Sequence, residues 1–159
     1  RLNSLLQEKN ILLVIKPHPY CILNTIEFSH TTNIKKITNK ELNAHNIVNY
    51  SFVGLFDGLL TDYSSVLFDY LLLDKPIAFT IDDLEQYQNT RGMNFSDPRA
   101  LMAGEHISTF DELCAYLNNF DGRLTAQGEK KIENLRNQFH HIQDDSASET
   151  LLKKIGLLK

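Results

Sequence analysis

Short apolar runs separated by polar turns organise this chain, and the clearest of them is Leu59-Leu60. This run ends in a polar turn, and a helical pattern with apolar residues on most of its faces covers 64–73. Lys75-Pro76 ends the helical pattern, and Ile77-Ala78-Phe79 begins another apolar run that is typical of a buried strand. The order of strand, turn, helix and strand predicts a βαβ unit of an α/β protein.

A second apolar run, 11–15, contains only isoleucine, leucine and valine, without polar alternation. Such a run is typical of a strand that is buried on both faces of a parallel sheet. It is followed by Lys16-Pro17-His18-Pro19. Because the prolines favour extended backbone at Lys16 and His18, we expect a cation and an imidazole at the carboxyl end of a central strand.

The other elements are predicted from weaker patterns. Short strands are expected at 34–37 and 47–48, and loops at 20–33 and 89–104. Helices are expected from Leu2 to about Asn10, over 39–46, 51–56, 82–87, 125–140 and 146–158, and from a cap-like Thr109 onwards. The apolar face of the last helix could contact lipid, but we favour packing against the sheet or another domain. It is formed by Leu151, Leu152, Ile155 and Leu158.

The composition is that of a soluble globular domain. The chain has 159 residues, of which 42% are hydrophobic and 23% charged, and a net charge of -4. This charge disfavours a nucleic-acid-binding protein or a broad basic membrane patch. The two cysteines, Cys21 and Cys114, lie far apart, which fits a reducing compartment and excludes a disulfide scaffold or a zinc ribbon. No apolar run approaches the roughly 20 residues that span a bilayer, so we expect a cytoplasmic protein.

We find no internal repeat or linker and therefore predict a single domain over residues 1–159. The chain begins at Arg1, already within a helical pattern, and lacks an initiating methionine. We therefore expect it to be a piece of a longer protein.

The turn after Leu60 is the main candidate for a binding site, because open parallel sheets bind ligands at the carboxyl ends of their strands. Ser64 or Ser65 can cap the following helix, and both present hydroxyls and free amides to an anion. Asp62 organises the turn by accepting hydrogen bonds from nearby amides. We interpret the turn as a phosphate site without glycines; the alternative is an ordinary helix cap, which needs only one serine.

Three further positions carry plausible chemistry. His18 is a general base or a phosphate ligand, with Lys16 adding positive charge. Asp69 can accept hydrogen bonds from a ribose diol, and Arg91 can bind a phosphate bidentately. The alternatives are a histidine packed in a proline-rich turn, a surface carboxylate and a solvated arginine.

The sequence predicts neither a metal site nor a cofactor. His140-His141 with Asp144-Asp145 resembles a metal cluster, but adjacent histidines on a helix point about 100° apart. We therefore favour a solvated helix end. The chain contains no glycine-rich nucleotide loop, no Cys-x-x-Cys and no glycine-flanked nucleophile elbow.

Several motifs, in this order and at these intervals, resemble the C-terminal half of the CDP-glycerol glycerophosphotransferase family, the teichoic acid primases and polymerases. The resemblance covers nearly the whole chain, and its most specific part is Thr61-Asp62-Tyr63-Ser64-Ser65 followed by Phe68-Asp69. The other matching motifs are Lys16-Pro17-His18-Pro19, Lys75-Pro76, Asp83 with Tyr87, Arg91-Gly92 and the stretch 109–148.

The resemblance implies a GT-B-type fold of two Rossmann-like halves, in which this chain is the donor-nucleotide half. The implied reaction transfers glycerol phosphate from CDP-glycerol to a hydroxyl of a lipid-linked surface polymer of the teichoic acid or capsule type, and releases CMP. The enzyme would lie peripherally at the inner face of the cell membrane. Other activated donors, such as CDP-ribitol or a sugar nucleotide, and a non-catalytic nucleotide-binding module are the alternatives.

The resemblance also implies roles for individual residues. Residues 16–18 and Ser64-Ser65 would hold the pyrophosphate, with His18 neutralising the charge on the leaving CMP, and Asp69 would contact the cytidine ribose. The family's N-terminal half, which carries a second histidine in a Trp-His-Gly-Thr-like motif, is absent from this chain, and we expect the general base there. Relatives often have arginine where this chain has Lys16, so the charge is kept but bidentate binding is lost.

Overall fold

The computed structural model describes residues 1–18, 27–90, 92, 95, 97–144 and 146–158. The strands are β1 Leu13–Ile15, β2 Ile34–Lys36, β3 Leu59–Thr61, β4 Ile77–Thr80 and β5 Glu105–Ile107. The helices are α1 Leu2–Glu8, α2 Asn39–Ala44, α3 Asn49–Val53, α4 Val66–Tyr70, α5 Leu84–Thr90, α6 Phe110–Asn119, α7 Ala126–Phe139 and α8 Ala147–Lys154. Two short 3-10 helices, η2 Leu71–Leu73 and η3 Pro98–Leu101, complete the described elements.

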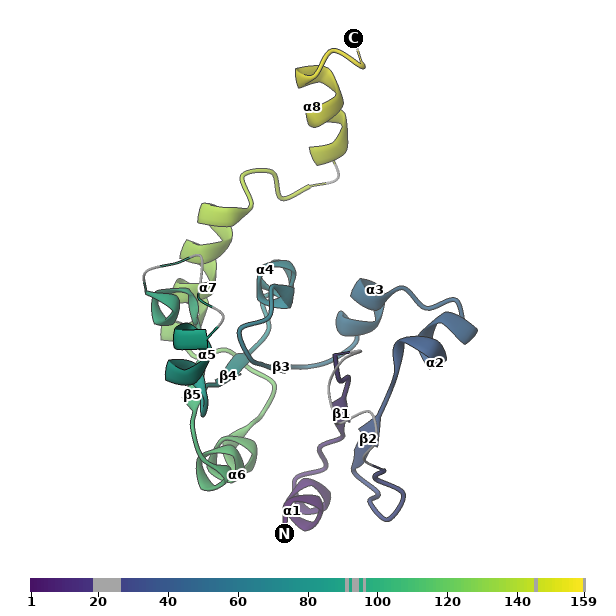
Figure 1. Ribbon diagram of the computed structural model, residues 1–159, viewed down its shortest axis with the longest axis vertical. Coiled ribbons are helices and arrows are strands. Elements are labelled where there is room, and N and C mark those ends of the chain that lie inside the picture. Colours follow the sequence, from purple (N-terminus) through teal and green to yellow (C-terminus); the bar gives the residue numbers. More distant parts are fainter. Residues whose placement is uncertain (19–26, 91, 93–94, 96, 145, 159) are drawn as a thin grey trace.

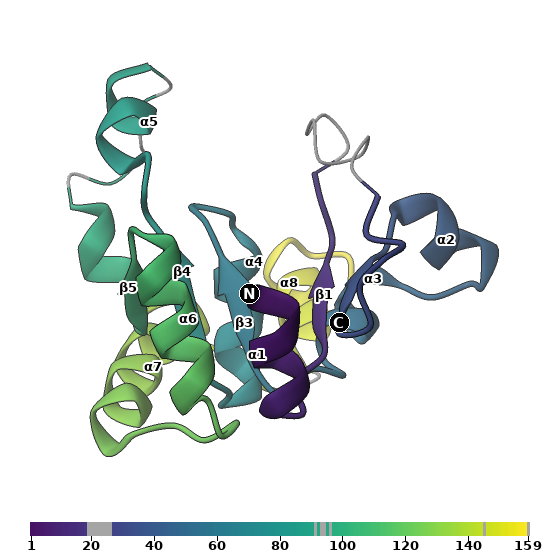
Figure 2. The same ribbon diagram turned by 90° about the horizontal axis from the view of Figure 1, so that it is seen from below.

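The strands form two parallel sheets that lie side by side. In one sheet β1 pairs with β2, and in the other the order is β3-β4-β5. Figures 1 and 2 show β1 next to β3, with α1 and α6 on one side of the strands and α3 and α4 on the other. Every pairing recorded between these strands is parallel, so the expected parallel α/β architecture is confirmed.

The β3-α4-β4 unit follows the predicted pattern closely. Leu59 packs against one core cluster and Leu60 against the other, because successive side chains of a strand point to opposite faces. The first cluster joins β4 to α4 and α7, and it includes Tyr70 and Phe79, which are 1% exposed. The second cluster joins α1, β2 and α6. Strand β3 therefore connects the two halves of the core.

A glycine allows β5 to approach β4. A Cβ atom on Gly104 would lie 1.6 Å from the backbone oxygen of Ile77, far closer than any real Cβ contact. A larger residue at this position would therefore push the chain away from β4 immediately before β5 begins. Strand β5 itself was not predicted, because Glu105-His106-Ile107 is a short, mostly polar sequence at the edge of the sheet.

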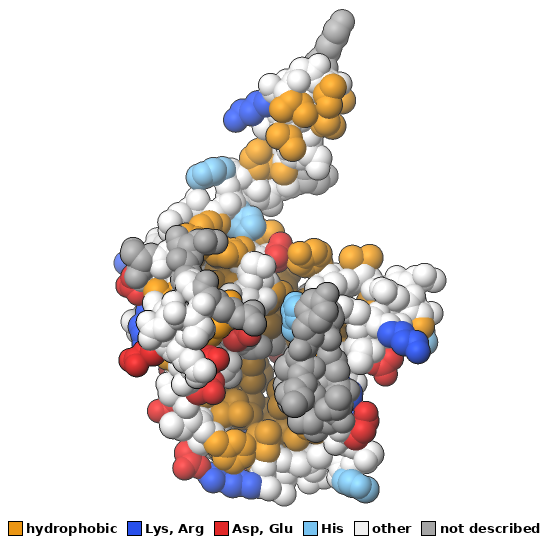
Figure 3. All heavy atoms as spheres, viewed as in Figure 1, with side chains coloured by type: hydrophobic (Ala, Val, Ile, Leu, Met, Phe, Trp, Pro, Cys, Tyr) orange, Lys and Arg blue, Asp and Glu red, His pale blue; other side chains and the backbone are white. Residues whose placement is uncertain are grey.

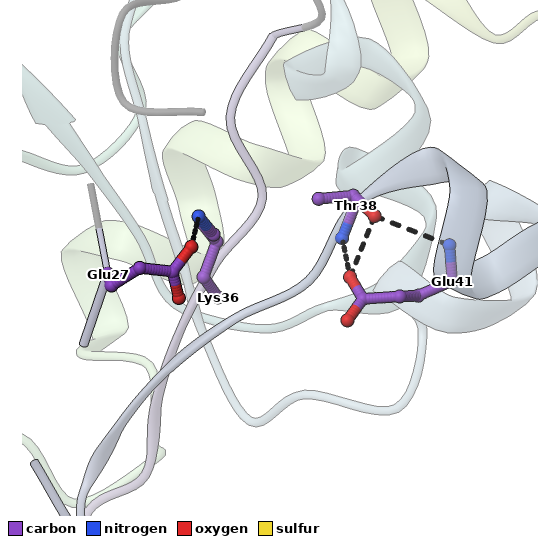
Figure 4. Close-up of polar contacts among 4 residues, drawn as sticks. All are labelled: Glu27, Lys36, Thr38 and Glu41. Atoms are coloured by element: carbon purple, nitrogen blue, oxygen red, sulfur yellow. Dashed lines mark hydrogen bonds and ion pairs between the residues drawn. The ribbon is translucent and has the colours of Figure 1, made fainter. Parts of the chain in front are cut away.

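Side-chain caps fix the starts of several helices. The predicted capping box at Thr109 is confirmed, and Glu112 closes it. Figure 4 shows a second box, in which the Thr38 hydroxyl accepts a hydrogen bond from the Glu41 amide while the Glu41 carboxylate accepts from Thr38. These hydrogen bonds hold the pKa of Glu41 below its usual value.

Three other predictions are wrong in detail. Residues 47–48 form no strand, since Val48 instead precedes α3 as its N-cap, and α3 begins two residues earlier than expected. The run 11–15 is a strand only from Leu13. All three strand residues are partly exposed, because β1 lies in a two-stranded sheet that few helices cover. Half of the loop predicted at 20–33, residues 20–26, lies outside the described residues.

The C-terminal helix differs most from expectation. Helix α8 ends at Lys154, and none of its residues is buried. Figure 1 shows it standing away from the strands beyond the end of α7. The packing against the sheet that we favoured is therefore not observed. No described helix has both the length and the apolar character needed to cross a membrane.

Candidate functional site

The predicted site residues follow the carboxyl ends of β1 and β3. Figure 2 shows the chain leaving β1, β3 and β4 at the same edge of the strands. After β1, Lys16 is half-buried, Pro17 is buried and His18 is exposed. The buried proline fixes the backbone between a cation and an imidazole, and the exposed imidazole is accessible at this edge.

The turn after β3 presents two exposed serines. The Asp62 carboxylate accepts a hydrogen bond from the Ser64 amide at 2.9 Å, which confirms that Asp62 organises the turn. The Ser64 hydroxyl accepts weakly from the Val66 amide at 3.5 Å. Ser65 occupies the N-cap position of α4, but its side chain makes no capping hydrogen bond. Of the two serines expected to cap this helix, only Ser64 bonds to a helix amide, and that bond is long.

Ser65 has unused hydrogen-bonding capacity. Within the residues that the structure describes, neither its amide nor its hydroxyl has a hydrogen-bond partner, and Ser65 is an exposed residue. Helix α4 has five residues, so its macrodipole is small and adds little to an anion site. The capacity of this turn to bind an oxyanion therefore depends on one free amide and two serine hydroxyls.

Tyr63 connects this turn to a distant segment, a contact that the sequence analysis did not predict. Its hydroxyl donates a hydrogen bond to the Asp83 carboxylate at 2.8 Å, and its ring lies 4.7 Å from that of Tyr87 in α5. Partial burial, together with the bond to Asp83, raises the pKa of Tyr63 well above its usual value. Asp83 and Tyr87 are four residues apart, a spacing that puts both on one side of the α5 start.

Asp69 is exposed on α4, four residues after Ser65, so the two side chains share one face of the helix. The helix is held from behind by α7. His140 makes a 2.7 Å hydrogen bond through Nε2 to the backbone oxygen of Phe68, and the rings of Phe68 and Phe139 are 4.6 Å apart. The expectation of a solvated helix end is therefore wrong for His140, which is half-buried and positions α4.

Lys75 holds the segment that leads into β3. Its ammonium donates hydrogen bonds to the backbone oxygens of Gly54 at 2.9 Å and Phe56 at 2.8 Å. The Tyr70 hydroxyl donates to the same Phe56 oxygen at 3.2 Å. Lys75-Pro76 was predicted to end a helix and to match a family motif, and its lysine also fixes the start of the strand that precedes the serines.

An open hollow of about 560 Å³ lies beside β2 and α2. Lys36 lines it and is opposite Ile15 in the strand register, next to the exit of β1. Figure 4 shows its ammonium paired with the Glu27 carboxylate, at 3.0 Å. Lysine charge in the hollow is therefore partly balanced by carboxylates.

The charges around the site are mixed. Figure 3 views the molecule as Figure 1 does, and the visible Lys and Arg side chains lie towards the margins of this face. In the described ranges, no three His, Cys, Asp or Glu side chains gather so as to hold a metal ion. Arg91, the other predicted phosphate ligand, lies outside the described residues.

A protein-family model described as CDP-Glycerol:Poly(glycerophosphate) glycerophosphotransferase matches residues 1–157. Among curated proteins, the chain is 29% identical over 159 residues to the teichoic acid ribitol-phosphate polymerase TarL of Staphylococcus aureus (strain NCTC 8325 / PS 47). This match covers 98% of the chain and 26% of TarL. A teichoic acid glycerol-phosphate primase of Bacillus spizizenii (strain ATCC 23059 / NRRL B-14472 / W23) is 57% identical over 82 residues, covering 52% of the chain and 20% of the primase.

The fold matches solved structures of the wall teichoic acid polymerase TagF. One match has a TM-score of 0.69 at 28% identity and covers 98% of this chain and 37% of TagF. A TagF variant soaked with CDPG gives the same TM-score at 27% identity and the same coverage. These matches confirm the expected fold class, a parallel α/β unit of the GT-B type. The chain spans about a quarter of the length of the first curated relatives that it matches.

Proposed function

The chain belongs to the CDP-glycerol:poly(glycerophosphate) glycerophosphotransferase family, and we propose that it is the donor-binding half of such an enzyme. The whole enzyme would transfer glycerol phosphate from CDP-glycerol to a hydroxyl of a lipid-linked surface polymer. Residues 1–159 would form one domain, and a second domain outside this chain would complete the cleft. The enzyme would work in the cytoplasm, peripherally at the inner face of the membrane, where a lipid-linked acceptor is within reach.

The observation that carries the proposal is the unused hydrogen-bonding capacity of Ser65 at the exit of β3. An exposed amide and hydroxyl without partners in the described chain suit a phosphate oxygen. Lys16 and His18 follow β1 at the same edge and would provide the positive charge that this turn lacks. Asp69 lies one helical turn after Ser65, where its carboxylate can accept from a ribose diol while the serines hold the phosphates.

The proposed step is a displacement at phosphorus. The acceptor hydroxyl attacks the phosphorus that carries glycerol, a new P–O bond forms, and the bond from that phosphorus to the oxygen of CMP breaks. The hydroxyl proton goes to a general base in the part of the enzyme outside this chain. Lys16, His18 and the serine turn stabilise the negative charge that collects on the departing CMP.

Two activated donors, which differ in their polyol, have specific support. The 57% identity to a glycerol-phosphate primase favours CDP-glycerol, whereas the relatives TarL and TarK are named as ribitol-phosphate polymerases. Both donors share the cytidine and the pyrophosphate. The residues discussed above would contact the shared part, so they do not distinguish the two.

Calorimetric titration tests the donor. CDP-glycerol, CDP-ribitol, CMP and UDP-glucose are titrated separately into the chain. We expect the two CDP-linked polyols to bind more tightly than CMP, and UDP-glucose not to bind. Equal binding of UDP-glucose would favour a sugar-nucleotide transferase. Binding of all four with no transferase activity in the full-length protein would favour a non-catalytic nucleotide-binding module.

A substitution of His18 tests whether this chain binds the donor while the other half of the enzyme supplies the general base. We expect His18→Ala in the full-length enzyme to weaken CDP-glycerol binding about tenfold, because a charge-assisted hydrogen bond to phosphate is lost. Exposed His141 at the end of α7 provides the matched control, and His141→Ala should leave donor binding unchanged. Loss of turnover in His18→Ala with unchanged donor affinity would count against this division of roles.

A further inference from the structure

The serine turn has few contacts of its own to define its shape. Its side chains contribute the bond from the Ser64 amide to the Asp62 carboxylate and a long 3.5 Å bond from the Val66 amide to the Ser64 hydroxyl, and the Ser64 backbone oxygen accepts from the Leu67 amide at 3.3 Å. Ser64 and Ser65 are exposed, and among the described residues neither the amide nor the hydroxyl of Ser65 has a hydrogen-bond partner, although its backbone oxygen accepts from the Phe68 amide at 3.1 Å. A short surface turn with so few bonds would sample several conformations, and ordering it would cost part of the affinity for any ligand.

One contact from outside the turn limits this freedom. Tyr63 lies between Asp62 and Ser64, and its hydroxyl reaches Asp83, twenty residues further along the chain. The tilted contact of its ring with the ring of Tyr87 adds a second point of attachment, to α5. Asp83 directly precedes Leu84, which begins α5 and is buried in the main core cluster. The turn is thus attached to a segment that the core holds.

We propose that Tyr63 and Asp83 are a positioning pair that holds the turn in the conformation in which Ser64 and Ser65 bind the donor's phosphates. The proposal rests on the proposed function for the identity of the ligand. Neither residue needs to touch the donor. The pair would act by ordering the turn before the donor arrives, so that less binding energy is spent on ordering it.

The hydrogen bond is suited to a permanent structural role. The pKa of the Tyr63 hydroxyl is raised, so the hydroxyl stays protonated and donates throughout the physiological pH range. The bond also occupies an acceptor site on the Asp83 carboxylate. The negative charge of this carboxylate lies close to a turn that would bind an anion. The carboxylates of Asp62 and Asp82 also raise the pKa of Tyr63. The competing explanation is that Asp83 acts only through its charge. In that case the Asp83→Asn variant would behave like Asp83→Ala and not like wild type.

Four variants separate the two explanations. Tyr63→Phe removes the donor and Asp83→Ala removes the acceptor, whereas Asp83→Asn keeps an acceptor oxygen and loses the charge. Tyr50→Phe is the matched control, because Tyr50 is 61% exposed on α3, away from this turn. Thermal unfolding and circular dichroism establish that each variant is folded before it is compared.

Hydrogen–deuterium exchange of the amides in 62–66 is the first readout, and it needs no ligand. We expect exchange to be about fivefold faster in Tyr63→Phe and Asp83→Ala, near wild-type in Asp83→Asn, and unchanged in Tyr50→Phe. Unchanged exchange in Tyr63→Phe would overturn the proposal, whatever the chain binds. Asp83→Asn behaving like Asp83→Ala would overturn it in favour of a charge effect.

Titration with CDP-glycerol is the second readout. We expect Tyr63→Phe and Asp83→Ala to bind about fivefold more weakly, and the double variant to lose no more than either single variant. CMP, which lacks the second phosphate, should be affected less. A full-length wild-type protein that binds no cytidine ligand would refute the proposed function, while the exchange result still decides whether the pair orders the turn. Faster exchange with unchanged CDP-glycerol affinity would overturn the positioning role.

Discussion

The two sheets of this molecule differ in how firmly they are packed, and the proposed site takes residues from both. In β4 the residues Ile77, Ala78 and Phe79 are 3%, 0% and 1% exposed. In β1 every residue is partly exposed, and the preceding Leu12 is 56% exposed. The serine turn follows β3, which pairs with this buried strand and ends in the buried Thr61, whereas Lys16 and His18 follow a strand without a buried residue.

This difference assigns different tasks to the two sides. A site on a well-packed element keeps its geometry without a ligand, whereas one on a loosely packed element gains its geometry on binding or from a neighbouring domain. We infer that the serine turn is the fixed part of the phosphate site. The part that follows β1 would be completed by the donor or by the rest of the enzyme.

The largest effect on the firmly packed side is expected at Gly104. We expect Gly104→Ala to lower the free energy of unfolding by about 3 kcal/mol or more, because the new Cβ would overlap the Ile77 backbone oxygen. Gly54→Ala is the control, since a Cβ there would meet its nearest atom at 3.6 Å. Urea unfolding of both variants measures the difference. Equal stabilities would show that β5 is not held closely against β4.

Two leucines compare the halves directly. We expect Leu71→Ala to cost about 3 kcal/mol, because Leu71 is fully buried in the main cluster. Leu13→Ala in β1 should cost about 1 kcal/mol, since that side chain is already partly in water. Urea unfolding again provides the measurement, and a larger loss for Leu13→Ala would reverse the comparison.

A smaller effect is expected at Lys75. We expect Lys75→Met to cost about 2 kcal/mol, because the Gly54 oxygen loses the donor that Lys75 provides and the Phe56 oxygen keeps only the Tyr70 hydroxyl. The methionine keeps most of the apolar stem, so packing changes little. Lys40→Met on α2, an exposed position, is the control and should be close to neutral. A neutral Lys75→Met would mean that water replaces the ammonium at no cost.

Local patterns in the sequence predicted the elements that depend on local physics. The strand at Leu59, the helix after Ser65 and the capping box at Thr109 are each encoded within about ten residues, and all three are observed. The family was also identified from motifs within single segments, and the match over residues 1–157 confirms it.

Features that depend on distant residues were missed. Strand β5 is polar, and its position follows from a close approach at Gly104 that no local pattern encodes. The contact of Tyr63 with Asp83 and the bond from His140 to the Phe68 oxygen join segments 20 and 72 residues apart. Helix α8 has an amphipathic sequence, but amphipathicity alone does not identify what covers the apolar face.

The most direct test of the central claim, that the serine turn binds the donor's phosphates, is a calorimetric titration of the Ser64→Ala/Ser65→Ala double variant with CDP-glycerol. Ser51→Ala on α3 is the control, since Ser51 is exposed and lies outside the serine turn. We predict that the double variant binds about tenfold more weakly than wild type, because two hydroxyls that contact the phosphates are lost. The control should bind normally. Wild-type affinity in a folded double variant would contradict the claim.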